Sequence, residues 1–145
     1  MTARTKSAAA PRVSCYELAL TLPELWRNRC ELDIEVLRMT EGTREKNTAR
    51  RAFHAYIERT EAVLALIVET RAESLADAAA QLLATYVSLA DDECPQIQGA
   101  ARAVISSFFV VAEAAGIDLE DVAFGHLAPY AARPEYIAKV EAVKS

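Results

Sequence analysis

Apolar residues recur along this chain at intervals of three and four positions, which is the spacing of one face of an α-helix. The stretch 43–72 shows the pattern most clearly, because its charged residues fall on the opposite face. No stretch of strand length alternates apolar and polar residues with a period of two. The apolar stripe of 43–72 consists of Ala49, Ala52, Phe53, Tyr56, Ile57, Thr60, Val63, Leu64 and Ile67.

Start and stop signals divide this pattern into separate helices. Ser14 and Glu17 have the spacing of a capping box, and Pro23 fits the first turn of a second helix. Gly42 and Gly116 stand where helices are expected to end. We therefore predict helices over about 14–20, 22–39, 43–72, 74–90, 95–115, 118–127 and 134–143.

These elements predict an all-α fold, a helical bundle with four long helices, two or three short helices, short connections and no sheet. The helix over 95–115 is apolar around more than half of its circumference, which is typical of the central helix of a bundle. A chain of 145 residues is long enough to bury a core as one domain. We assign residues 14–145 to a single helical-bundle domain and residues 1–13 to a disordered basic tail.

Composition places the chain among ordinary globular proteins, with 52% apolar and 26% charged residues. No uninterrupted apolar run approaches the roughly 18 residues of a membrane span, so we expect no membrane partner. The three cysteines, Cys15, Cys30 and Cys94, are too few and too far apart for a disulfide framework or a zinc ribbon. We expect inert core thiols, and we expect the reduced cytoplasm as the location because no secretory signal is recognisable.

The segment 108–122 has a small residue at Ala112, a turn glycine at Gly116 and an apolar anchor at Val122. It resembles the helix-turn-helix of phage-repressor-type DNA-binding domains, over about 20 of the 145 residues. The resemblance implies that the helix after the turn enters the major groove of DNA.

The charge of this region departs from that family. The helix after the turn contains Asp118, Glu120 and Asp121 where a DNA reader needs basic or amide side chains. Residues 73–145 together carry a net charge of −7, within a total of −5 for the chain. Because DNA phosphates repel these carboxylates, nucleic acid is not an expected partner.

The predicted helix over 22–39 contains an unusual charged pair inside its wide apolar sector. Arg29 and Asp33 lie four positions apart, beside Trp26 and Cys30. Two apolar strips separated by charges fit a helix that packs inward on one side and meets a partner subunit on the other. Alternatively, an arginine fork beside an aromatic wall suits a carboxylate or phosphate ligand, with Arg102 as a further contributor. Snorkelling of the pair at the surface is a third explanation.

A basic cluster at the start of the predicted helix over 43–72 opposes the helix dipole. One explanation is an anion site, in which these side chains and the free N–H groups bind a phosphate or carboxylate. The other is ion pairing with Glu41, Glu45 or acids of the C-terminal half, which we prefer because no glycine-rich phosphate loop is present. The cluster consists of Arg44, Lys46, Arg50 and Arg51.

The sequence indicates no metal site and no cofactor. His54 and Glu58 have the spacing of a helical metal-binding pair, but they lie on the solvated face. No Glu-x-x-His pair of the di-iron type accompanies them.

No catalytic motif is recognisable, so three hypotheses of function follow, in order of preference. The first is a non-enzymatic helical module that acts through association as a homo-oligomer such as a homodimer, because the helix over 22–39 has more apolar width than one core contact uses. The second is a helical bundle that binds an anionic small molecule, or acts as an enzyme, through Trp26, Arg29, Asp33 and Arg102. The third is a DNA-binding helix-turn-helix protein.

Overall fold

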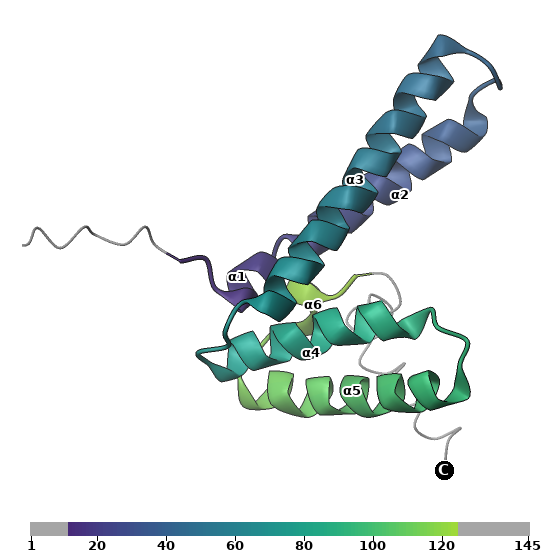
Figure 1. Ribbon diagram of the computed structural model, residues 1–145. Coiled ribbons are helices and arrows are strands. Elements are labelled where there is room, and N and C mark those ends of the chain that lie inside the picture. Colours follow the sequence, from purple (N-terminus) through teal and green to yellow (C-terminus); the bar gives the residue numbers. More distant parts are fainter. Residues whose placement is uncertain (1–11, 125–145) are drawn as a thin grey trace, which may run out of the picture.

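The computed structural model describes residues 12–124, and within them all regular structure is helical (Figure 1). The predicted all-α fold, with four long helices packed against each other and short ones beside them, is confirmed. The helices are α1 (Cys15–Ala19), α2 (Leu22–Arg38), α3 (Arg44–Glu69), α4 (Leu75–Ala90), α5 (Pro95–Ala114) and α6 (Leu119–Val122).

The helices begin at the capping signals in the sequence. At α1, the Ser14 hydroxyl accepts a hydrogen bond from the Glu17 amide at 3.1 Å, and the Glu17 carboxylate accepts one from the Ser14 amide at 3.0 Å. This pair is the predicted capping box. At α4, the Ser74 hydroxyl accepts from the Asp77 amide at 3.0 Å.

The long helices form two antiparallel pairs, α2 with α3 and α4 with α5 (Figure 1). The α2–α3 hairpin extends away from the other pair, and only its base, next to α1, rests on α4. The 26 residues of α3 span about 39 Å, whereas the 16 residues of α4 span about 24 Å. The outer part of the hairpin therefore lies beyond the rest of the described chain.

The hydrophobic core lies where the base of the hairpin meets α4. The first turn of α2, the last turns of α3 and the middle of α4 meet there, and α5 adds its side chains from the far side of α4. Because Ile67 is 21 positions from Lys46 along α3, the tip of the hairpin is about 31 Å from this core. The buried core residues are Cys15, Ala19, Leu22, Leu64, Ile67, Ala79, Ala80, Leu83, Ala84, Phe108, Ala112, Val122 and Phe124.

A buried carboxylate joins α1 to α4. Asp77, whose exposed fraction is 4%, accepts hydrogen bonds from the amides of Tyr16 and Glu73, both at 3.0 Å. The Tyr16 amide belongs to the first turn of α1, where no carbonyl of the same helix is in reach. Asp77 therefore holds the start of α1 against the start of α4.

The end of α3 is satisfied by side chains from two other helices. The carbonyls of Ile67 and Thr70 both accept from the Cys15 thiol, at 3.6 and 3.4 Å, and from the Gln81 amide group. These carbonyls lie past the last intrahelical donors of α3. The contacts explain why α3 ends at Glu69, about three residues before the predicted end at 72.

The prediction that the helix over 95–115 is central is wrong. It is α4 that contacts α1, α3 and α5, while α5 packs mainly along α4. No other helix of residues 12–124 covers the outer face of α5, where Val110 is 67% exposed. An apolar circumference shows that a helix could bury more than one of its faces. Whether other helices pack against those faces depends on the tertiary structure.

Among the helices within residues 12–124, α5 is the one long and apolar enough, by length and composition, to cross a membrane. Only 17% of that stretch is buried in the fold. One helix of this kind is a weak indication of a span, since helices of soluble proteins pass the same test. The absence of a membrane partner stays a prediction.

The predicted helix over 118–127 is shorter than expected, because α6 ends at Val122 and residues 123–124 are not helical. Its remaining positions, the predicted helix over 134–143 and residues 1–11 of the predicted tail lie outside the described residues.

Candidate functional site

An open cleft of about 570 Å³ lies between the base of the hairpin and α4. Its walls come from three helices, α2, α3 and α4, and from Phe124 after α6. A volume of this size is within the usual range for small-molecule sites. The lining residues are Trp26, Arg29, Ile57, Thr60, Glu61, Leu64, Ala65, Val68, Glu69, Tyr86, Val87, Ser88, Ala90, Asp91 and Phe124.

Two aromatic rings and one arginine, Trp26 and Arg29 of α2 and Phe124 after α6, form part of the cleft wall. The Trp26 and Phe124 ring centroids are 5.6 Å apart, with their planes at 52°. The guanidinium carbon of Arg29 lies 4.4 Å from the Trp26 ring centroid and 5.8 Å from that of Phe53. Arg29 and Trp26 are three positions apart on α2, so they share one face of the helix. The ring faces attract the cation and hold it in place.

The structure brings two of the four predicted ligand residues together. Trp26 and Arg29 both line the cleft. Asp33 is exposed and lies outside the lining, and within residues 12–124 no ion pair joins it to Arg29. Arg102 is exposed on α5 and also lies outside the lining. The structure therefore does not bring Asp33 to Arg29, whose guanidinium lies over the Trp26 and Phe53 rings instead.

The charge of the cleft is acidic. Against the one cation, Arg29, the described lining contains three carboxylates, those of Glu61, Glu69 and Asp91. Because this balance repels an anion, the cleft does not match the expected carboxylate or phosphate ligand.

Most lining residues carry no signal of a site in the sequence. Ile57, Leu64 and Tyr86 belong to ordinary apolar stripes, and Phe124 follows a short helix. Their meeting depends on how α3 crosses α4. The single tryptophan beside an arginine was the one signal that sequence reasoning found.

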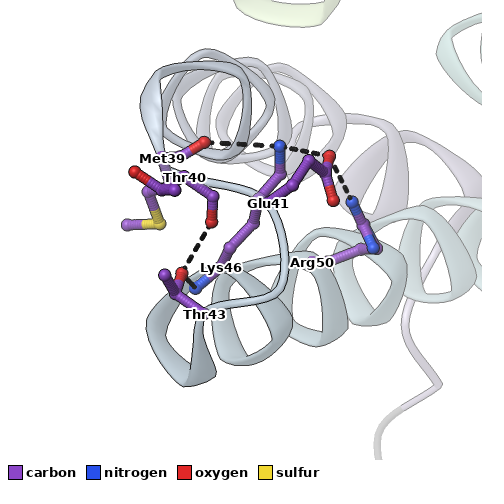
Figure 2. A network of polar contacts seen from close by, with 6 residues as sticks. All are labelled: Met39, Thr40, Glu41, Thr43, Lys46 and Arg50. Atoms are coloured by element: carbon purple, nitrogen blue, oxygen red, sulfur yellow. Dashed lines mark hydrogen bonds and ion pairs between the residues drawn. The ribbon is translucent and has the colours of Figure 1, made fainter.

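The predicted basic cluster lies at the tip of the hairpin, where Figure 2 shows a network of polar contacts. The Lys46 ammonium group contacts the Glu41 carboxylate at 2.5 Å and donates to the Met39 carbonyl at 3.4 Å. Arg50 binds the same carboxylate at 3.3 Å. Lys46 is only 7% exposed, so its charge is enclosed by these partners.

This network is the ion-pairing arrangement with Glu41. The hydrogen bond and charge of Lys46, followed by the charge of Arg50, lower the pKa of Glu41. The other two members of the cluster, Arg44 and Arg51, are exposed, and Arg51 donates to the Asn47 carbonyl at 3.4 Å. The structure does not gather the four side chains around a common anion site.

A second apolar stripe runs along α2, on a face that α3 does not cover. Cys30, Ile34 and Leu37 follow one another at intervals of four and three positions. Cys30 is exposed, Ile34 is 49% exposed and Leu37 is 75% exposed. We call these three residues the outer stripe. By contrast, Val36 of the same helix is buried.

The three cysteines differ in their surroundings. Burial and the charge of Asp77 raise the pKa of the Cys15 thiol, so this thiol is inert at neutral pH. Cys94 is half-buried. Cys30 is exposed on the outer stripe, which corrects the expectation of a core thiol at that position.

Within residues 12–124, no three or more His, Cys, Asp or Glu side chains are grouped so as to hold a metal ion. His54 is exposed, and its ring lies 5.6 Å from that of Phe53.

The segment that resembles a helix-turn-helix has the turn, but within the described residues the helix after the turn is a single helical turn. Gly116 has a φ of 69°, in the left-handed region that glycine favours. The helix that follows, α6, is four residues long and begins with Leu119 and Glu120. A helix of one turn that is acidic cannot place a row of basic side chains in a major groove.

No protein-family model, no curated protein and no solved structure matches this chain.

Proposed function

We propose that this protein is a non-enzymatic helical module that forms homodimers through its projecting α2–α3 hairpin. The observation that carries the proposal is the outer stripe of Cys30, Ile34 and Leu37, an apolar face exposed on a part of the fold that no third helix of residues 12–124 covers.

The outer half of the hairpin has little core of its own. Its buried residues are Val36, Lys46 and Ala49, and one of these three is a charged side chain in the tip network. Most helical stability in proteins comes from the packing of apolar faces. Two such hairpins placed face to face form a four-helix bundle, which would bury the outer stripe of both copies.

The charges beside the outer stripe suit pairing between identical surfaces. Arg27, Glu31 and Arg38 are all exposed on α2, and they include both signs. A two-fold axis brings the same patch of both copies together, so a patch of one sign would repel itself. A mixed polar rim around an apolar centre is the usual composition of an interface.

A small-molecule function has less support. The cleft contains Trp26 and Arg29, but in its described lining carboxylates outnumber the one cation, and Asp33 and Arg102 lie elsewhere. For DNA binding, the described part of the chain offers after the turn only the acidic, four-residue α6. Among the three hypotheses, association through the hairpin has the strongest support, because the outer stripe is an exposed apolar surface on which a second copy could pack.

Sedimentation velocity of the full chain across the micromolar range tests the proposal. We expect the parent chain to be a dimer, Leu37→Glu to be a monomer, and the matched control Val110→Glu, on exposed α5, to remain a dimer. Loss of one buried leucine costs about 2 kcal/mol. A symmetric dimer loses it twice, so the dissociation constant should rise about a thousandfold.

Two results would refute the proposal. The first is a parent chain that is monomeric throughout the micromolar range. The second is a dimer that Val110→Glu dissociates and Leu37→Glu leaves intact, which would place the interface on α5.

A further inference from the structure

The cleft at the base of the hairpin is positioned next to the end of the described chain. Phe124, the last described residue, is 4% exposed and packs its ring against Trp26 in the cleft wall. The chain continues for 21 residues beyond it. The C-terminal residues therefore leave the described fold directly at the wall of the cleft.

The sequence of these 21 residues contains an apolar face of its own. With about 100° per helical residue, Tyr136, Ile137, Val140 and Val143 fall on one side of a helix. Ten such residues extend about 15 Å, shorter than the roughly 24 Å of α4. The residues between Phe124 and Pro134 give a reach of up to about 30 Å, so the face can arrive anywhere in the cleft.

The charges of the segment complement those of the cleft. On the same helical wheel, Lys139 and Lys144 lie nearer to the apolar face than Glu135 and Glu141 do. The described rim of the cleft contains the carboxylates of Glu61, Glu69 and Asp91. An apolar face with lysines at its edges therefore fits an apolar cleft with an acidic rim.

We infer that the cleft is the docking site of the chain's own C-terminal segment, residues 125–145. Tyr136, Ile137, Val140 and Val143 pack against the apolar walls, and the two lysines meet the acidic rim. This contact is separate from the outer stripe, so it holds or fails independently of dimerisation.

Trp26 is the single tryptophan of the chain and lines the cleft, so its fluorescence reports whether the cleft is covered. The test uses the full chain with Ile137→Asp and Val140→Asp together. The matched control, Ala138→Asp with Ala142→Asp, adds the same charge on the opposite side of the predicted helix. We expect quenching of Trp26 by acrylamide to rise about twofold in the first variant and to stay at the parental value in the control. Equal quenching in the parent and the first variant would overturn the inference.

A second measurement does not depend on the stability of that variant. A nitroxide is attached at Ala142→Cys in a full chain with Cys30→Ser and Cys94→Ser, which leaves the buried Cys15 unlabelled. We expect it to broaden the NMR signals of Trp26 and Val87 and to spare those of Gly42 at the tip. Absence of broadening in the cleft would overturn the inference.

The nature of the occupant is decided by mixing. Isotope-labelled chains without nitroxide are combined with nitroxide-labelled chains without isotope. Broadening of the cleft signals in this mixture means that the segment of a second copy fills the cleft, which contradicts docking within one chain.

Binding of an apolar dye gives a further check. If the parent binds the dye as strongly as the Ile137→Asp, Val140→Asp variant does, the cleft of the parent is open, and docking of the C-terminal segment is contradicted.

Discussion

The buried carboxylate of Asp77 offers a sharp test of how the base of the fold is held together. We consider Asp77→Ala, which removes both acceptors for the Tyr16 and Glu73 amides, each now bound at 3.0 Å. Asp77 is 4% exposed, so the space near its carboxylate is largely closed to water. The two amides would lose their partner, and water could replace it only in part.

The magnitude follows from these two bonds. A donor left without a partner in a buried site costs about 1–3 kcal/mol. Both bonds are only partly buried, so we take the lower half of that range for each and expect a total of about 2–4 kcal/mol. With a urea m-value of about 2 kcal/mol/M, the midpoint of unfolding should fall by about 1–2 M.

Asp118→Ala is the matched control for Asp77→Ala. Asp118 also accepts from a backbone amide, that of Glu120 at 3.0 Å, but it is exposed, so water takes over the bond. Its loss should cost about 1 kcal/mol or less. Urea unfolding followed by circular dichroism compares the two variants. If Asp77→Ala shifts the midpoint no more than Asp118→Ala does, burial is not what makes this contact matter, and the reasoning fails.

Three further predictions concern the hairpin and the cysteines. Because its partners lower the pKa of Glu41, the ion pair at the tip stabilises the fold above the unfolded-state pKa of about 4.3 and is lost as the pH falls through the folded value. The difference in unfolding free energy between the parent and Glu41→Gln should therefore vanish on acidification, and a difference that does not change with pH would contradict this. Cys30 should react at once with a thiol reagent, and Cys15 only after denaturant is added, since it is buried and its pKa is raised. Gly42→Ala should destabilise the protein by about 1 kcal/mol in thermal unfolding, because Gly42 has a φ of 78°. Gly99→Ala, within α5, should not destabilise it, because the added Cβ comes no closer than 3.9 Å to the Arg102 side chain.

Helix starts could be predicted because their causes are local. Ser14 with Glu17 and Ser74 with Asp77 contain both partners of a cap within four positions. The end of α3 was placed too late because its cause is distant, since the donors Cys15 and Gln81 come from other helices. A cap supplied from far along the chain leaves no mark in the local sequence.

The candidate site was predicted only where one helix supplies it. Trp26 and Arg29 are three positions apart, so their shared face follows from helical geometry alone. The same geometry placed Asp33 near Arg29, but it did not reveal that the Trp26 and Phe53 rings compete for the guanidinium. Phe53 lies on another helix, and its distance from α2 is a property of the folded hairpin.

The sequence by itself determined that this protein is helical, where most helices begin and which residues share a face. Only the tertiary structure decided that α2 and α3 project as a hairpin, that α4 rather than α5 is central, and that Ile34 and Leu37 remain exposed. Periodicity shows that a face is apolar, because it depends on neighbours three and four positions away. It does not show what covers that face, because the partner of an apolar face is chosen by contacts between distant parts of the chain.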